Sequence, residues 1–374
     1  MNRRPSQSRT GFDSFSPQHT AHFKAAQPGG EFFEPKPRAS LGRRLLLALL
    51  LMTLIALAVN LAVNQFVRVA RVTVPIRRMD PAFEGYTLLQ ISDLKGATYG
   101  SNQALIRFAL QNEDFDAVVF TGDMVSSRGN AQPLYALIEM LRELKPDAPI
   151  YMIPGDKDPL PASMSYATGG SPFAPWVLGA KQRGGQLLSA PVQIERDGHT
   201  LWLTTSALLS LDMDTMQAQF ERQYLDALAN GDENAIELTT YNLQWLTETR
   251  NARAKMTDAD VYIALTHVPP ADEELESAYP GSLRERVHLV LCGHYQGGLI
   301  RLPFAGALFI PSQNLPLYGL LPGADTYFGL TRKGRTYLYV SPGLGGNDGL
   351  DPLPFFRLFN PPTVSLISLT TSSL

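Results

Sequence analysis

Aspartate and histidine side chains recur at the ends of short apolar runs along this sequence. Strand ends meet at one edge of an α/β sheet, so side chains that follow several strands can form one site. A single Asp there is usually a helix cap or a turn residue, and a single His is usually a buried, hydrogen-bonded one. Five in order instead predict a site for metal or acid–base chemistry. The pairs that end the runs are Ser92-Asp93, Gly122-Asp123, Gly155-Asp156, Thr266-His267 and Gly293-His294.

The five runs that position these residues have the composition of buried strands bounded by polar residues or Gly. Helical patterns between the first three, at 102–112 and 132–145, indicate an α/β domain whose strands are covered on both faces. Asp197 and Gly198 predict a hairpin turn within 192–204, and Lys333-Gly334 predicts another. Hairpins within an α/β frame favour a layered sandwich. The predicted strands are 87–92, 117–121, 150–154, 261–266 and 287–292.

The stretch from about 212 to 258 has a helical rather than a strand pattern. Apolar residues from Met216 to Leu228 have helical spacing, and a break at Gly231-Asp232 precedes a second helix. We expect a helical insertion that covers one end of the sheet. A helix pair with a purely packing role is the alternative, because such a stripe is usually core.

The N-terminal region divides into a polar tail and an apolar span. Residues 1–43 are rich in Ser, Pro, Gln and Arg and predict a disordered basic tail. Residues 45–63 are almost wholly apolar apart from Thr53 and Asn60, and at ~1.5 Å per residue they can just cross a ~30 Å hydrocarbon core. We therefore expect a transmembrane anchor over 44–67; the alternative is the apolar region of a secretory signal.

The charges that flank the span do not determine its orientation, since equal numbers of basic residues lie close on its two sides. The expected location is the cell membrane, with the main domain extracytoplasmic. At 374 residues and 44% hydrophobic, the chain can bury a sizeable core. A net charge of -3 gives no reason to expect a nucleic-acid partner. Cys292, the single cysteine, is expected to be a small buried hydrophobe.

The ordered motifs resemble the calcineurin-like metallophosphoesterases, in particular their membrane-anchored bacterial branch. The resemblance implies that 85–374 fold as a four-layer α/β/β/α sandwich of metallophosphoesterase type, with two metal ions bridged by one aspartate. The resembling segments are LLQISDLKGATYG (88–100), VVFTGDMVSS (118–127), IYMIPGDKDP (150–159), VYIALTHVPP (261–270), LVLCGHYQGGLIRLP (289–303), YLYVSPGLGG (337–346) and FNPPTVSLISL (359–369).

The resemblance also assigns roles to positions of this chain. The first metal would be held by Asp93, position 95, Asp123 and position 296. The second metal would share Asp123 and would take three more ligands. Position 157 would be the general acid or transition-state stabiliser, oriented by Asp158. The ligands implied for the second metal are Asp123, Asp156, His267 and His294.

Several of these positions depart from the family pattern. Lys95, Lys157 and Gln296 stand where histidines are expected, Asp156 replaces an asparagine, and Ser126 replaces a carboxylate. An ammonium cannot ligate a cation. Unit charges ~4 Å apart interact by ~4 kcal/mol at an effective dielectric constant of ~20, so the Lys95 ammonium would repel a divalent ion and attract carboxylates. We expect it to occupy the place of the first metal, which leaves Gln296 as a weak carbonyl ligand.

The second ligand set is complete and suits one divalent ion such as Mn, Fe or Zn. A hydrogen-bonded polar cluster without metal, with Lys95 or Lys157 as counter-ion, is the alternative, because buried charges need partners in either case.

Three functional hypotheses follow. The first is a hydrolase in which the metal polarises a phosphoester while Lys95 and Lys157 neutralise developing charge. The second is an inactive pseudo-phosphoesterase that serves as a binding or scaffold module at the membrane, and the third is a structural partner in a cell-envelope complex. A lipid- or envelope-linked phosphoester substrate is suggested only by association with the membrane.

Overall fold

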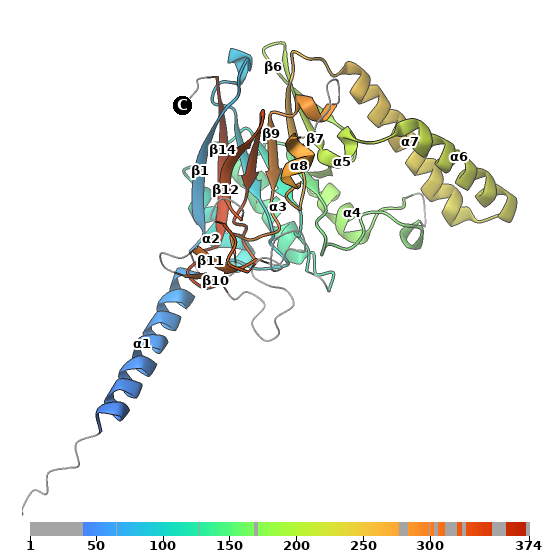
Figure 1. The fold of residues 1–374 in the computed structure, drawn as a ribbon. Coiled ribbons are helices and arrows are strands. Elements are labelled where there is room, and N and C mark those ends of the chain that lie inside the picture. The colour runs from blue at the N-terminus through green and yellow to red at the C-terminus, as the bar shows by residue number, and fades with distance from the viewer. Residues whose placement is uncertain are drawn as a thin grey trace, which may run out of the picture. The chain divides into compact units, whose positions relative to one another are not determined.

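The structure is a computed structural model that describes residues 40–64, 66–126, 128–167, 171–276, 283–298, 300–302, 306–310, 320–323, 327–345 and 357–371. The tail expected over 1–43 lies almost wholly outside these residues. The fold is drawn in Figure 1.

The N-terminal element is the helix α1 (Leu41–Val63), whose mean hydropathy is 2.7 over its most apolar window. Leu and Ala, which dominate it, are strong helix formers. Its 23 residues extend about 35 Å at ~1.5 Å per residue, enough to cross a hydrocarbon core. Among the residues described, α1 is the one helix long and apolar enough to span a membrane.

The rest of the fold is built on two six-stranded mixed sheets. In the first, β14 runs antiparallel to β2 and the other neighbours are parallel. In the second, the edge strands β12 and β6 are antiparallel to their neighbours and the inner strands are parallel. The first sheet has the order β1 (Arg68–Pro75), β14 (Thr363–Thr370), β2 (Thr87–Ile91), β3 (Ala117–Thr121), β4 (Ile150–Ile153), β5 (Gly185–Leu187). The second has the order β12 (Gly329–Lys333), β13 (Thr336–Val340), β9 (Leu289–Cys292), β8 (Val261–Leu265), β7 (His199–Thr205), β6 (Val192–Arg196).

Three apolar clusters define the layers. One lies between the sheets and joins residues such as Val119 and Ile367 of the first to Ile263 of the second. A second packs the other face of the first sheet against α2 (Ala104–Leu110), α3 (Gln132–Leu144) and α4 (Pro175–Gln182). The third covers the outer face of the second sheet. The predicted layered α/β sandwich is therefore confirmed.

The outer layer on the second sheet consists of small elements. The third cluster includes Leu209 and Ala307, and Leu275 packs against it. These residues belong to α5 (Ser206–Leu209), to β11 (Gly306–Phe309) of a hairpin with β10 (Ile300–Leu302), and to α8 (Asp272–Glu276). Four 3-10 helices complete the described fold: Pro81–Phe83, Ser101–Gln103, Met164–Tyr166 and Leu283–Arg286.

The predicted local elements agree closely with the structure. The five predicted strands correspond to β2, β3, β4, β8 and β9, with ends that differ by at most two residues. The turn between β6 and β7 has positive φ at Asp197 (52°) and Gly198 (79°), as a type I′ turn requires. Local sequence patterns therefore suffice to place the strands that carry the Asp and His residues.

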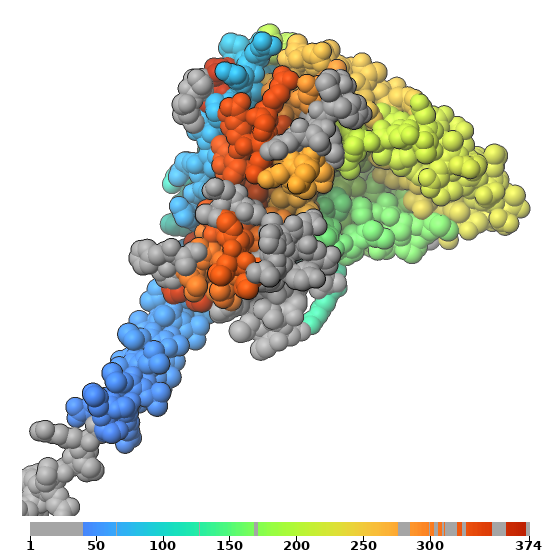
Figure 2. Space-filling model, viewed as in Figure 1, coloured from blue at the N-terminus to red at the C-terminus, as the bar shows by residue number. Residues whose placement is uncertain are grey.

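Two long helices, α6 (Met213–Asn230) and α7 (Glu233–Lys255), lie in the range of the expected insertion. The Asp212 and Asp232 carboxylates cap their N-termini by accepting backbone hydrogen bonds, and Gly231 (φ 64°) makes the left-handed turn between them. Figures 1 and 2 show this hairpin, in yellow, projecting beside the sheets. Phe220 is buried, but Leu228, from the same predicted stripe, is 48% exposed, because the far end of the hairpin extends beyond the sheets.

Candidate metal centre

The Asp and His residues predicted to share a sheet edge do come together. Ligand atoms of Asp156, His267 and His294 lie within 4.8 Å of one another, and so do those of Asp93, Asp123 and His267. Asp93, Asp123 and Asp156 follow strands β2, β3 and β4 of the first sheet, in that order. His267 and His294 follow strands β8 and β9 of the second. The cluster therefore lies where the two sheets meet.

The turns that carry these side chains have an uncommon backbone conformation. Positive φ angles occur at Asp93 (57°), Lys95 (49°), Asp123 (55°), His294 (70°) and Gln296 (51°). A non-glycine residue in this region costs of order 1–3 kcal/mol, and such residues concentrate at functional sites. Lys95 and Gln296 share this conformation with Asp93, Asp123 and His294, so their turns belong to the same local architecture as the candidate ligands.

The second-metal half, defined as Asp123, Asp156, His267 and His294, has two carboxylates and two imidazoles facing one another. His267 Nε2 lies 2.9 Å from Asp156 Oδ1 and 3.4 Å from Asp123 Oδ2. His294 Nδ1 lies 3.3 Å from Asp156 Oδ1 and 3.4 Å from His267 Nε2. Asp156, His267 and His294 thus offer three mutually close ligand atoms, and Asp123 adjoins them through His267, a donor set that suits one divalent ion.

A backbone carbonyl fixes the orientation of His267. Its Nδ1 lies 2.8 Å from the carbonyl oxygen of Thr121, which can only accept, so Nδ1 carries the hydrogen and Nε2 faces the carboxylates. A Cβ at Gly122 (φ 92°) would lie 2.6 Å from His267 Nδ1. Glycine at this position thus allows the close approach. A partner of this kind is typical of metal-binding histidines.

Mutual contacts shift the pKa values in this half. Burial opposes the charged form of His267, but hydrogen bonds with Asp123 and Asp156 outweigh it and raise its pKa to about 11. The hydrogen bonds with His267 and then His294 hold the pKa of Asp156 far below its usual range. Burial would raise the pKa of Asp123, but its contacts with His267 and Lys95 keep it lowered. Both carboxylates are thus anionic and available as ligands.

The first-metal half, defined as Asp93, Lys95 and Gln296 with the shared Asp123, is different. Lys95 Nζ lies 3.2 Å from Asp123 Oδ2 and 3.9 Å from Asp93 Oδ1, and the lysine side chain is only 8% exposed. Asp93 Oδ2 accepts hydrogen bonds from Ser92 Oγ (2.6 Å) and from the backbone of His294 (3.1 Å). A buried ammonium 3.2 Å and 3.9 Å from the two carboxylates would repel a divalent ion placed between them, so this half does not fit a second one.

The turn at Gln296 is held by residues that the sequence did not indicate. Its backbone carbonyl accepts hydrogen bonds from Arg357 Nη2 (3.0 Å) and Asn360 Nδ2 (2.7 Å). The fully buried Arg357 also donates to the carbonyls of Pro342 and Gly345. Arg357 is thus a positioning residue, because its guanidinium donates hydrogen bonds to the carbonyls of Gln296, Pro342 and Gly345.

Arg357 is linked in turn to the last turns of α1. Asn60 Nδ2 donates to the Arg357 carbonyl (2.6 Å), and Asn60 Oδ1 accepts from the Phe359 backbone (2.9 Å). Asn60 is 2% exposed, whereas most of α1 is exposed. A lone Asn in an apolar run was the available signal for this contact.

Lys157 and Asp158 lie beside the cluster. Lys157 Nζ is 3.0 Å from Asp156 Oδ2, and this contact raises its pKa. The Asp158 carboxylate accepts hydrogen bonds from the backbones of Gly155 (2.8 Å) and Val125 (2.7 Å), so it braces the loops after β4 and β3. Burial raises the pKa of Asp158 to about 6 against these hydrogen bonds. That Asp158 orients Lys157 stays a prediction.

Ser126 and Cys292, which the sequence analysis also considered, make contacts that support the fold. Ser126 Oγ accepts a hydrogen bond from the backbone of Asn130. Cys292 is fully buried, its thiol faces the Tyr339 carbonyl, and burial raises its pKa. It behaves as the small buried hydrophobe that was expected.

The chain matches known proteins over most of this region. The family profile described as "Calcineurin-like phosphoesterase" matches residues 86–296. The chain is 25% identical over 294 residues to the uncharacterized metallophosphoesterase YkuE of Bacillus subtilis (strain 168), a match that covers 78% of this chain and 81% of that protein.

Solved structures are also similar to parts of the chain. The phosphopantetheinyl hydrolase PptH from Mycobacterium tuberculosis aligns at 11% identity with a TM-score of 0.34, covering 74% of this chain and 96% of that one. The protein TT1561 of Thermus thermophilus aligns at 10% identity with a TM-score of 0.35, covering 70% and 90%. The family profile spans more than half of the chain, and the chain therefore belongs to the calcineurin-like phosphoesterase family.

Proposed function

We propose that this chain is a membrane-anchored phosphoester hydrolase that works with one divalent metal. The metal (Mn, Fe or Zn) would be held by Asp123, Asp156, His267 and His294. The observation that carries the proposal is a contrast. Asp156, His267 and His294 form one ligand group, with Asp123 Oδ2 3.4 Å from His267 Nε2, whereas the buried ammonium of Lys95 lies between Asp93 and Asp123. In this arrangement Lys95 takes the place of the first metal, and Gln296 has no first metal to ligate.

The chain's own residues would do the following work. A bound divalent ion supplies Lewis-acid polarisation of the phosphoryl oxygens and a lowered pKa for a bound water. The Thr121 carbonyl accepts the hydrogen bond from His267 Nδ1, so Nε2, whose proton a bound metal would displace, is the nitrogen that faces the metal site. Lys157, whose side chain is 54% exposed, would meet the phosphoester at the mouth of the site and neutralise developing charge there. Lys95 would neutralise charge from its buried position beside Asp93 and Asp123. Asp158 would hold the loops after β3 and β4 together through its hydrogen bonds.

A second candidate function is phosphoester binding without turnover, as a binding or scaffold module. Lys157 is the observation that favours it. Its ion pair with Asp156 raises its pKa, which makes it a poor proton donor to a leaving group. The family position of the general acid is therefore filled by a side chain suited to charge neutralisation.

The location is part of the proposal. Residues 44–67 would anchor the protein in the cell membrane, 1–43 would form a basic tail, and 85–374 would form the extracytoplasmic phosphoesterase-like domain with its helical insertion at about 212–258. The apolar helix α1 supports the anchor. A lipid- or envelope-linked phosphoester is the proposed substrate, and no nucleic-acid partner is expected at a net charge of -3.

The test uses the full-length protein purified in detergent with Mn²⁺. We expect about one metal ion per chain and turnover of bis(4-nitrophenyl) phosphate, with both lost in His294→Ala. His199→Ala is the matched control, because His199 is exposed and pairs with Asp80 outside the cluster. Bound metal without turnover would favour the binding module. A wild-type protein that binds no metal would contradict the hydrolase, and the binding module would then hold its phosphoester without metal.

A further inference from the structure

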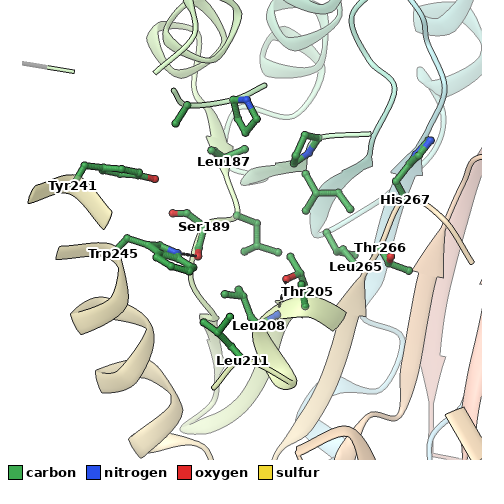
Figure 3. A pocket seen from close by; sticks show the side chains of 16 residues that line it. Leu187, Ser189, Thr205, Leu208, Leu211, Tyr241, Trp245, Leu265, Thr266 and His267 are labelled. Atoms are coloured by element: carbon green, nitrogen blue, oxygen red, sulfur yellow. Dashed lines mark hydrogen bonds between the residues drawn. The ribbon is translucent and has the colours of Figure 1, made fainter. Parts of the chain in front are cut away.

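An apolar pocket of about 410 Å³ adjoins the metal centre. Its walls come from the ends of β4, β5 and β8, from the segment around α5, and from α7 of the helical hairpin. Figure 3 shows Tyr241 and Trp245 of α7 on one side and Thr266 and His267 on the other. Leu187, Leu208 and Leu211 lie between them. The volume falls within the range of about 300–1,000 Å³ that is typical of small-molecule sites.

The polar groups on these walls are already engaged within the protein. Trp245 Nε1 donates to the Ser189 carbonyl, and the Tyr241 hydroxyl is hydrogen-bonded to Ser189. Thr205 Oγ1 accepts from the Leu208 backbone, and Thr266 Oγ1 donates to the Val268 carbonyl. The pocket therefore offers a ligand mainly carbon surface, and a polar occupant would lose its hydrogen bonds with water.

His267 belongs both to the wall of the pocket and to the candidate metal centre. It lines the pocket, its Nδ1 is held by Thr121, and its Nε2 lies 2.9 Å from Asp156 Oδ1. A molecule with a phosphoryl group at the metal centre would thus have the pocket directly beside that group. The chain also carries a helix that can span a membrane, where molecules with apolar chains and phosphate groups are concentrated.

We propose that this pocket binds the alkyl chain of an amphiphilic phosphoester whose phosphoryl group lies at the metal centre. This inference rests on the proposed function and names the substrate class. It also gives α7 a role beyond packing, because Tyr241 and Trp245 form one wall of the pocket.

The test measures binding rather than turnover. The full-length protein is placed in phosphatidylcholine nanodiscs with Mn²⁺ and titrated calorimetrically with inorganic phosphate and with butyl, hexyl and octyl phosphate. Heats from empty nanodiscs are subtracted. Each buried methylene strengthens binding about fourfold, so Kd should fall by at least about tenfold from butyl to octyl phosphate.

Two variants block the pocket, and a third is the matched control. Ala207→Phe adds bulk at an exposed lining position, and Leu211→Asp places a charge on the wall. Ala218→Phe is the control: it makes the same Ala-to-Phe substitution at an exposed position of α6 that does not line the pocket. We expect the first two to abolish the chain-length dependence while phosphate still binds, and the third to retain it.

The outcomes separate this inference from the proposed function. Phosphate binding without any dependence on chain length would overturn only the pocket assignment. A dependence that persists unchanged in Ala207→Phe and Leu211→Asp would overturn it as well, because the bilayer would then be its source. Failure of inorganic phosphate to bind to the wild type would overturn the proposed function, and the substrate assignment with it.

Discussion

The two halves of the metal centre share Asp123 and a common backbone geometry, yet they differ in how their charge is compensated. In the second-metal half, two imidazoles face two carboxylates, and Asp156 and His294 remain partly exposed. In the first-metal half, a buried lysine ammonium lies between two buried carboxylates. The second half is therefore partly open to solvent, whereas the first contains a buried lysine cation.

This difference shows that buried carboxylates in one cluster can be compensated in two ways. Buried carboxylates need a partner, and an ammonium satisfies that need without an ion from solution. The left-handed turns at Asp93, Lys95 and Gln296 persist because the surrounding loops, including the carbonyls bound by Arg357, hold them. The Lys95 ammonium therefore determines the chemistry of the first half, while similar turns support both halves.

The largest effect is expected from Asp123→Asn, which disturbs both halves. Lys95 would lose the nearer of the two carboxylates beside it, and removal of one partner from a buried ion pair costs about 3 kcal/mol or more. The second half would lose the Asp123 carboxylate, one of its proposed ligands, as well. We expect thermal unfolding at a temperature lower by about 6 °C or more, together with loss of bound Mn²⁺. Unchanged stability would show that Lys95 does not depend on this pair.

His267→Ala should affect the second half alone. Loss of partners outside the ligand shell already weakens metal binding by about 10–100-fold, so loss of a ligand should weaken it by at least about 100-fold. Lys95 keeps its contacts with Asp93 and Asp123. Equilibrium dialysis with Mn²⁺ measures the change, with His199→Ala as the control. Wild-type affinity in His267→Ala would mean that the metal is bound elsewhere.

Lys95→His combined with Gln296→His tests whether the first half is silenced by these two residues alone. The double variant removes the internal cation and supplies two imidazole ligands on turns that already have the required backbone conformation. We expect the Mn²⁺ content to rise from one to two ions per chain, measured by elemental analysis. Lys95→Met is the control, since it removes the ammonium without adding a ligand. A content of one ion in the double variant would place the loss in other residues.

The sequence predicted the strands and the convergence of their terminal residues because both depend on local patterns. Apolar runs predicted β2, β3, β4, β8 and β9, and the Asp197-Gly198 turn predicted the β6–β7 hairpin. The partners that orient the site were not predictable in the same way. The Thr121 carbonyl is a backbone atom, and Arg357 binds loops that are distant in the sequence. The pocket was missed as well, because it requires α7 to pack beside β8.

The smallest effect is expected from Ser92→Ala, which separates stability from metal binding. Ser92 Oγ donates to Asp93 Oδ2 at 2.6 Å, and both residues are fully buried. Loss of such a hydrogen bond should lower the free energy of unfolding by about 1–3 kcal/mol, because one buried carboxylate oxygen loses a donor. Metal affinity should stay at the wild-type value, since Asp93 lies in the half that already contains Lys95. Urea unfolding and Mn²⁺ dialysis measure the two quantities on one preparation. If Mn²⁺ affinity instead fell together with stability, Asp93 would be a metal ligand and the first half would not be closed by its lysine.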